Sequence, residues 1–511
     1  NYASLRRYLQ DQGVQCASET DTEVLAKLIG KFLAADGYDL ETAVQAALRE
    51  VSGAYAIAVI SADEPDTLVV ARKGSPMIIG LTRDGYLAAS DAAAIVSHAT
   101  QVVTLDDYQV ARLTTGECGP EIRTTTVDNI PVSREIEELE LDLGEIELQG
   151  HPHYMIKEIM EQPRVLTNAL RGRIDRREGR VVLGGLSDFS RDLVRAHRFI
   201  FTGQGTAWHA ALLGEYLLED LARTPAKTEY ASELRYRNPV IEDGTVVVAV
   251  SQSGETADTL AALKEAKDRG ARAIGVVNVV GSTIARETDA GVYLHVGPEI
   301  GVASTKAFVG QVMVLTLMAL FVGRRKHLSA EVTAEYLAAL EQIPDHVERI
   351  LEQSDHIRSE VARVIDRDNW LFLGRGYNYP VALEGALKLK EISYIHAEGM
   401  PAAEMKHGPI ALIDEGMPVV FVTPRGSQYD KAVSNIEEVR ARGGRILAVA
   451  SEDDTEIERY AETVFRIPVV PEPLQPLLSV VPLQLLAYHA AVLRGHDVDK
   501  PRNLAKSVTV E

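Results

Sequence analysis

Short runs of β-branched and aromatic residues alternate along the chain with longer stretches whose apolar residues recur at helical spacing. This alternation is clearest after residue 190, where it predicts parallel strands covered on both faces by helices. The predicted strands are RFIFT (198–202), TVVVAV (245–250), AIGVVNVV (273–280), NWLFL (369–373), PVVFVT (418–423) and RILAVA (445–450). The pattern therefore predicts doubly wound α/β sheets.

The same pattern occurs twice. GQGTAWHAALLGEYLLED (203–220) aligns with GRGYNYPVALEGALKLKE (374–391), and the next strand and turn recur with Gly254 matching Gly426. A repeat of this length predicts a duplicated domain, and duplicated domains often place a site between the copies. We expect the two copies at 190–325 and 360–495.

Residues 1–133 have a different pattern, that of a partial α/β unit. VLAKLIGKFL (24–33) predicts a helix, and GAYAIAVI (53–60) and TLVVAR (67–72) predict strands. The stretch 134–148 then carries seven acids in fifteen residues, which is typical of a solvated connector. We expect a linker at 134–165 and a short tail at 496–511.

Composition narrows the class of protein. The 511 residues carry a net charge of -21 and are 46% hydrophobic, so we expect a globular protein that binds small molecules, not nucleic acid or a membrane. The apolar stretch 309–323 contains Gln311 and falls short of the ~20 residues of a membrane span, so it predicts a buried helix. Cys16 and Cys118 have no disulfide or metal spacing, which is typical of a reducing cytoplasm.

A turn rich in hydroxyls, SQSGETADT (251–259), follows one predicted strand and opens a helix. Backbone N–H groups and the helix dipole favour an anion there, and the added hydroxyls suit a phosphate monoester. The turn lacks the Lys-Ser/Thr pair of a P-loop, and GQGTAW lacks the third glycine of a dinucleotide fingerprint. The alternative is that Ser253 or Thr256 only caps the helix. The candidate ligands are Ser251, Gln252, Ser253 and Thr256.

The corresponding turn of the second copy, TPRGSQYD (423–430), has Pro424 and Arg425 where the first copy has Gln252 and Ser253. Its hydroxyl set is lost. We therefore expect one phosphate site, in the first copy, with the second copy contributing chemistry.

Several residues of the second half could carry that chemistry. Glu384, Lys388 and Glu391 share one helical face, where spacing alone favours a solvated stripe but a carboxylate and an amine could also converge on a ligand. His407 precedes a Gly-Pro turn and is either a surface residue or a general acid/base. Lys506 is either an exposed tail lysine or, if desolvated, a Schiff-base amine.

Five motifs, taken in the order in which they occur, resemble those of one protein family. The resemblance covers nearly the whole chain. SQSGETADTL, PEIGVASTKAF, LEGALKLKEISYIHAE, KHGPIALID and the terminal PRNLAKSVTVE resemble the glutamine:fructose-6-phosphate aminotransferases, also called glucosamine-6-phosphate synthases. The resemblance implies an α/β fold of two doubly wound parallel-sheet SIS domains preceded by part of an N-terminal-nucleophile glutaminase domain.

The resemblance also implies an activity. Fructose 6-phosphate becomes glucosamine 6-phosphate with ammonia from glutamine, the first committed step of amino-sugar synthesis, in a cytoplasmic homodimer without metal or organic cofactor. Lys506 would form an imine at carbon 2, Glu391 would move a proton from carbon 1 to carbon 2, and Lys388 would stabilise charge on oxygen. His407 would assist ring opening from a neighbouring subunit.

The family's binding residues match positions of this chain. Most family members have a serine at Ala207, so one hydrogen bond of the pocket is missing here. Asp21, in SETDTEVLA (18–26), would bind the α-amino group of glutamine, although Thr20 to Glu23 also fits a helix-capping box and both can hold. The implied sugar-phosphate ligands are Thr206, Ser251, Gln252, Ser253, Thr256, Val302 and Ala505.

The glutaminase machinery departs from the family pattern. The amino-terminal cysteine, the glutamine-binding arginine and the Asn-Gly oxyanion element would all precede Asn1, so we expect further residues upstream and glutamine as a substrate only if they are present. Neither Cys16 nor Cys118 lies at the position of the family's amino-terminal cysteine. The rival interpretations are a sugar-phosphate isomerase that makes no amine and a SIS-domain sensor without turnover, which has no need of Glu391, His407 and Lys506 together.

Overall fold

The computed structural model describes residues 1–35, 37–91, 94–116, 119–133, 136–138 and 147–508. The chain divides into two compact units, the first taking in residues 1–147 and the second Leu148–Ser507. Cys118 and most of the acidic stretch predicted as a connector lie outside the described residues.

The first unit combines helices with two antiparallel sheets, of strand order β1-β2-β6-β7 and β4-β3-β5-β8. The predicted strands at 53–60 and 67–72 are β1 and β2, and the predicted helix lies in α2. Cys16 is half-buried against this unit's core. The elements are α1 (Tyr2–Asp11), α2 (Asp21–Leu33), α3 (Leu40–Glu50), β1 (Tyr55–Ser61), β2 (Glu64–Lys73), β3 (Ile78–Leu81), β4 (Tyr86–Ala89), β5 (Gln101–Thr104), β6 (Gln109–Gly116), β7 (Gly119–Thr126) and β8 (Glu137–Glu138).

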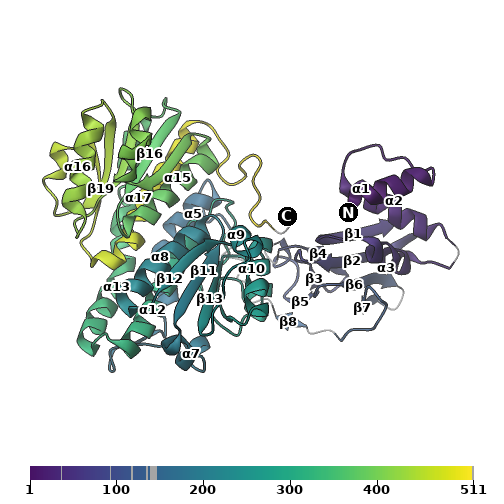
Figure 1. Ribbon diagram of the computed structural model, residues 1–511. Coiled ribbons are helices and arrows are strands. Elements are labelled where there is room, and N and C mark those ends of the chain that lie inside the picture. The colour runs from purple at the N-terminus through teal and green to yellow at the C-terminus, as the bar shows by residue number, and fades with distance from the viewer. Residues whose placement is uncertain (36, 92–93, 117–118, 134–135, 139–146, 509–511) are drawn as a thin grey trace. The chain divides into compact units, whose positions relative to one another are not determined.

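The second unit begins with a parallel sheet of order β12-β11-β13-β14-β15. All seven residues of β13 are buried, because helices cover both faces of the sheet (Figure 1). The elements are β11 (Arg198–Gly203), α8 (Thr206–Ala222), β12 (Ala226–Tyr230), α9 (Ala231–Tyr236), β13 (Thr245–Ser251), α10 (Ala257–Asp268), β14 (Arg272–Val277), α11 (Thr283–Glu287), β15 (Ala290–Tyr293) and α12 (Lys306–Lys326).

A second parallel sheet repeats this order as β17-β16-β18-β19-β20, so the predicted duplication is confirmed. One continuous apolar core joins the two copies. The elements are β16 (Asn369–Gly374), α15 (Asn378–Ser393), β17 (His396–Pro401), the 3-10 helices η3 (Glu404–His407) and η4 (Pro409–Leu412), β18 (Pro418–Val422), α16 (Tyr429–Arg440), β19 (Arg445–Ser451), η5 (Ile457–Arg459), β20 (Thr463–Ile467), η6 (Glu472–Leu474) and α17 (Gln475–Leu493).

Further helices precede and join the copies. Part of the segment predicted as a linker is folded: α5 and α6 bury Met155, Ile159 and Leu166 in the core of the second unit. The predicted linker, 134–165, therefore extends too far along the chain. The acidic run on which it was based ends at residue 148, before the helix α5 begins at Tyr154. These elements are α5 (Tyr154–Met160), α6 (Gln162–Leu170), β9 (Ile174–Asp175), β10 (Arg180–Val181), η2 (Gly184–Leu186), α7 (Ser190–Arg195), α13 (Ala330–Leu351) and α14 (Ser354–Ala362).

Among the residues that the structure describes, two helices are long and apolar enough to cross a membrane by length and composition, Lys306–Lys326 and Glu472–Leu493. Their apolar windows are 100% and 89% buried inside the protein. They are core helices of the two copies, and the buried helix predicted at 309–323 is confirmed.

Candidate active site

The hydroxyl-rich turn lies between β13 and α10. The Ser251 hydroxyl lies 3.2 Å from that of Thr256 and accepts a hydrogen bond from the backbone N–H of Gly254 at 3.0 Å. Thr256 occupies the N-cap position of α10, yet its side chain makes no capping hydrogen bond. Helix capping therefore does not account for this threonine, and both hydroxyls face each other across the turn.

The turn needs glycine at one position. Gly254 has a φ of +67°, and a Cβ there would lie 2.0 Å from Oγ of Ser282. Ser253 accepts a hydrogen bond from the N–H of Glu255 at 3.2 Å, and Gln252 accepts one on its carbonyl oxygen from the N–H of Asn278 at 3.2 Å. The side chains of Gln252 and Ser253 stay half-exposed.

Thr206 lies at the same carboxyl edge of the sheet, because β11 and β13 are neighbours. It is the first residue of α8, and Ala207 directly behind it supplies no hydroxyl. A Cβ at Gly203 would lie 3.0 Å from the carbonyl oxygen of Val250 at the end of β13. The loop before Thr206 thus lies directly against the strand that leads into the hydroxyl-rich turn.

Thr206 is also where the two copies meet. Its hydroxyl donates to Glu384 of α15 at 2.9 Å and accepts from Nζ of Lys388 at 3.0 Å. Lys388 donates in turn to Glu391 at 2.6 Å, and Oε1 of Glu384 lies 3.5 Å from its Nζ. The side chains of Lys388 and Glu384 are 1% and 0% exposed, so the solvated stripe that spacing alone favours is wrong.

Electrostatics keep this lysine charged. Burial alone would lower the pKa of Lys388, but the carboxylates of Glu391 and Glu384 raise it above its ordinary value. Glu384 is further held by Nδ1 of His209 at 2.7 Å. Glu391 is partly exposed, so it is the more accessible of the two carboxylates that hold Lys388.

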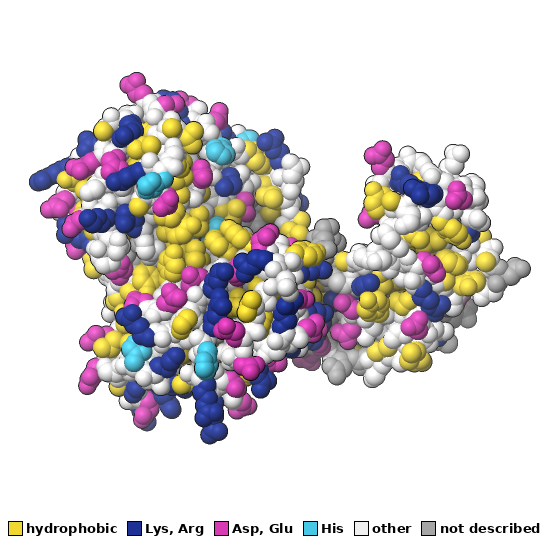
Figure 2. Space-filling view, in the orientation of Figure 1, with side chains coloured by type: hydrophobic (Ala, Val, Ile, Leu, Met, Phe, Trp, Pro, Cys, Tyr) yellow, Lys and Arg dark blue, Asp and Glu magenta, His cyan; other side chains and the backbone are white. Residues whose placement is uncertain are grey.

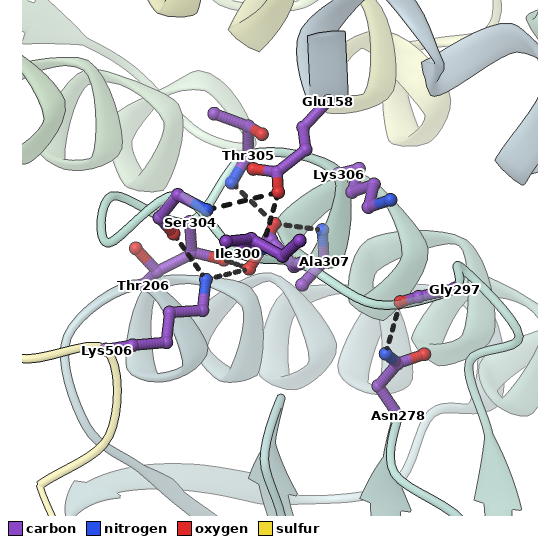
Figure 3. Close-up of polar contacts among 12 residues, drawn as sticks. Glu158, Thr206, Asn278, Gly297, Ile300, Ser304, Thr305, Lys306, Ala307 and Lys506 are labelled. Carbon is purple, nitrogen blue, oxygen red and sulfur yellow. Dashed lines mark hydrogen bonds and ion pairs between the residues drawn. The ribbon is translucent and has the colours of Figure 1, made fainter. Parts of the chain in front are cut away.

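The tail brings Lys506 to the loop between β15 and α12. Its Nζ donates to Oε2 of Glu299 at 2.7 Å and to the carbonyl oxygen of Gly301 at 2.8 Å. Figure 3 shows the amine directed at this loop. The side chain is 20% exposed, so Lys506 is not the freely exposed tail lysine of the alternative interpretation.

Glu299 is a fully satisfied buried carboxylate. It accepts hydrogen bonds from the N–H groups of Thr305 and Ala307 and from the hydroxyl of Ser304, besides Lys506. Burial would raise its pKa, but Lys506 and these donors lower the pKa of Glu299 to about 2. It therefore stays ionised and holds the Lys506 amine.

The tail is anchored to the start of α5 before it reaches Lys506. The carboxylate of Asp499 accepts the N–H groups of Tyr154 and Met155 at 2.8 and 2.9 Å. Val302, expected in the sugar pocket, donates its N–H to the carbonyl oxygen of Asp499 at 3.4 Å, and Ala505 is exposed beside Lys506. The two backbone positions thus lie where the tail meets the 299–305 loop.

Two expected site residues are not part of these contacts. His407 ends η3 and is exposed, and no hydrogen bond or ion pair of the described residues joins it to Lys388 or Lys506. Asp21 is the exposed first residue of α2, where Thr20 caps the helix by accepting from the N–H of Glu23 at 3.3 Å. The predicted capping box is only half formed, because the Glu23 carboxylate instead accepts the N–H groups of Ala17 and Ser18.

The second copy places a carboxylate on its corresponding turn. Glu472 accepts from the N–H and the hydroxyl of Ser427 at 3.1 and 2.8 Å, and a Cβ at Gly426 would lie 3.1 Å from its carboxyl carbon. Glu472 follows β20 just as Glu299 follows β15, since AGVYLHVGPE and TVFRIPVVPE align without a gap. The anion position of the second copy is therefore filled by the chain itself.

Sequence reasoning missed Glu299, Glu158 and His209. Glu299 lies inside the motif PEIGVASTKAF, and Glu158 is an acidic residue in the otherwise largely apolar helix YMIKEIM, so each had a local sequence signal.

Within the described ranges no group of three or more His, Cys, Asp and Glu could hold a metal ion. Figure 2 shows acidic and basic side chains interspersed over the visible face, without the single-sign patch of a nucleic-acid interface.

Comparisons with known proteins identify the domains of the chain. A glutamine amidotransferase domain model matches residues 1–97, and a SIS domain model matches residues 192–322 and 364–494. The C-terminal domain of glucosamine-fructose-6-phosphate aminotransferase from Francisella tularensis superimposes with a TM-score of 0.66 at 37% identity, covering 69% of this chain and 100% of that chain.

Curated relatives match over the whole chain. A Chlorobaculum tepidum protein named glutamine-fructose-6-phosphate aminotransferase (isomerizing) is 53% identical, covering 100% of this chain and 83% of that protein. A Bacteroides thetaiotaomicron protein of the same name is 50% identical with the same coverage. On this similarity, together with the two SIS domains and the amidotransferase domain, the chain belongs to the glutamine-fructose-6-phosphate aminotransferase (isomerizing) family.

Proposed function

We propose that this protein converts fructose 6-phosphate to glucosamine 6-phosphate with ammonia derived from glutamine. The proposal rests on one observation: the tail delivers the Lys506 amine to the loop after β15, at the carboxyl edge of the sheet where the Ser251–Thr256 turn follows β13. A phosphate on that turn and an amine at the same edge of the sheet fit an open-chain ketose phosphate. The relatives named above act on this substrate by name.

The chemistry uses the chain's own residues. The phosphate binds the hydroxyls of Ser251, Ser253 and Thr256 with the amide of Gln252, and Thr206, Val302 and Ala505 line the sugar. Lys506 attacks carbon 2, and water leaves as the imine forms. Ammonia then displaces the lysine amine and leaves a sugar imine.

The isomerisation follows from the Glu391–Lys388 pair. Glu391 takes a proton from carbon 1 and returns it to carbon 2, so that carbon 1 becomes the aldehyde and nitrogen stays on carbon 2. Lys388, kept cationic by its carboxylate neighbours, stabilises the charge that develops on oxygen. Fructose 6-phosphate and ammonia thus give glucosamine 6-phosphate and water.

The remaining assignments concern assembly and the first unit. His407 is exposed and lies outside the contacts around Lys506, which supports a homodimer in which it opens the sugar ring at the partner's site. We place this biosynthetic enzyme in the cytoplasm. Asp21, exposed at the start of α2, binds the α-amino group of glutamine. We assign the glutaminase domain to 1–133, the SIS domains to 190–325 and 360–495, and the catalytic tail to 496–511.

Product analysis tests the proposal. With fructose 6-phosphate and ammonium, the full chain is expected to form glucosamine 6-phosphate, and Lys506→Ala is expected to form none. Glucose 6-phosphate as the sole product would instead favour an isomerase that makes no amine. Tight binding of fructose 6-phosphate with no product would favour a sensor.

A further inference from the structure

Glu158 is a buried carboxyl group that the proposed chemistry does not use. It lies on α5 with 1% of its surface exposed, and its side chain points at the 299–305 loop (Figure 3). Oε1 accepts the backbone N–H groups of Ile300 at 2.5 Å and Gly301 at 3.1 Å. A buried carboxyl group is costly unless it is hydrogen-bonded, so these two contacts fix the loop against α5.

Gly301 also binds the reactive lysine. Gly301 donates its N–H to Glu158 and accepts the Lys506 amine on its carbonyl oxygen at 2.8 Å. A Cβ at Gly301 would lie 3.0 Å from Oε2 of Glu158 and 3.4 Å from the N–H of Met155. Glycine at 301 therefore lets the loop lie against the helix, so that one residue contacts both Glu158 and Lys506.

The tail is fixed to the same helix. Asp499 accepts the first N–H groups of α5, at Tyr154 and Met155, and its carbonyl oxygen accepts the N–H of Val302. Thus α5 holds both the start of the tail and the loop that receives the tail's lysine. A shift of the loop relative to α5 would move the Glu299 and Gly301 acceptors away from Lys506.

We propose that Glu158 is a positioning residue for the reaction: by holding the N–H groups of Ile300 and Gly301, it fixes the acceptors that aim the Lys506 amine at the sugar. It does not touch the substrate. The inference rests on the proposed role of Lys506 as the imine-forming amine.

Charge explains why a carboxyl group can do this beside Glu299. Burial and the Glu299 carboxylate raise the pKa of Glu158 to about 8, opposed by Lys506 of the tail and Lys306 of α12. At neutral pH Glu158 is therefore an uncharged acceptor that does not compete with Glu299 for the ammonium group. When it ionises at higher pH, its negative charge competes with Glu299 for the Lys506 amine and disturbs the position of that amine.

Trapping of the imine by cyanoborohydride in the full chain with fructose 6-phosphate tests this role. Glu158→Gln keeps a neutral acceptor and is expected to trap at neutral pH within about twofold of the wild type, whereas Glu158→Ala frees the loop and should trap roughly ten- to a hundredfold more slowly. Fructose 6-phosphate affinity should be unchanged in both. Glu360→Ala is the control: this buried carboxylate binds Thr463 and Arg363, away from the loop, and should trap like the wild type.

The pH profile is a second readout, independent of whether Glu158→Ala folds. The trapping rate of Glu158→Gln relative to the wild type should rise above pH ~8, because only the wild type gains a charge there. A flat ratio, wild-type trapping by folded Glu158→Ala, or equal damage by Gln and Ala would overturn the positioning role. Absence of trapping in the wild type would instead contradict the proposed function on which it rests.

Discussion

Lys388 is a buried cation whose contacts join the two copies of the sheet. It lies between Glu384 and Glu391 and shares the hydroxyl of Thr206. Removing one member of a buried ionic cluster leaves its partner uncompensated, which costs far more than losing a pair at the surface. The cluster therefore has a structural consequence besides its proposed catalytic role.

Lys388→Met is expected to lower the free energy of unfolding by about 3 to 5 kcal/mol, because it leaves Glu384 charged, buried and without its cation. The matched control is Lys406→Met, which removes an ion pair with Glu438 at the surface and should cost less than ~1 kcal/mol. Urea unfolding curves of the three proteins measure both values. Equal small losses would show that Lys388 does not compensate a buried charge.

The stability of the second unit should depend on pH through Glu158. Its pKa is raised from 4.5 to about 8 in the folded chain, so the folded chain binds this proton more tightly than the unfolded chain. The contribution to stability is complete below pH 4.5 and is lost as the pH rises to about 8. Glu158→Gln removes this titration, so melting temperatures from pH 5 to 8 should fall less in the variant than in the wild type. Parallel curves would contradict the raised pKa.

Residue types in local motifs could be predicted from the sequence, but their long-range partners could not. Ser251 and Thr256 stand in one turn, and Lys388 and Glu391 on one helical turn, so spacing places each pair together. Glu299 meets Lys506 across more than two hundred residues, and Glu158 meets the same loop from a third segment. Only the fold brings such groups together, and burial, not spacing, decided against a solvated stripe.

At the scale of the element, the two strand-to-helix turns differ in what occupies them. In the first copy the hydroxyls of Ser251 and Thr256 face each other without capping α10. In the second copy the carboxylate of Glu472 lies on the turn before α16. The prediction of a single phosphate site therefore gains a physical reason, since a negative side chain opposes a phosphate.

Calorimetric titration with fructose 6-phosphate should accordingly give one site per chain. Ser251→Ala and Thr256→Ala should each weaken binding about ten- to a hundredfold, the typical effect of one lost hydrogen bond to a charged group. Ser427→Ala, on the turn of the second copy, is the control and should leave affinity unchanged. Two sites per chain, or equal weakening by the Ser427 variant, would contradict the assignment.

The strands were predictable because parallel sheets bury both faces and read as apolar runs, as β13 does. The run 273–280 was predicted too long: β14 ends at Val277, because the side chain of Asn278 binds the backbone of Val296 and Gly297. The helix α5 was missed because the acidic run before it indicated a linker. Local composition predicts neither that the Asn278 side chain binds the backbone next to the strand nor that the core of the second unit begins at α5.

For the whole molecule, the exposed position of His407 bears on assembly. Lys406 beside it is paired with Glu438, while His407 ends the short helix η3. If it acts at the partner's site, two inactive chains can complement each other. Unfolding and refolding a mixture of His407→Ala and Lys506→Ala should then recover up to about a quarter of wild-type activity, because half of the dimers contain one intact site out of two. No recovery would show that His407 acts within its own chain.

The proposed mechanism requires the tail lysine to form the covalent link to the sugar. Reduction of the full chain with cyanoborohydride in the presence of fructose 6-phosphate, followed by peptide mass mapping, tests it directly. We predict one sugar phosphate per chain, attached to Lys506, and none in Lys506→Ala. A sugar attached to Lys388 or Lys306, or labelling that persists in Lys506→Ala, would rule out Lys506 as the imine-forming amine.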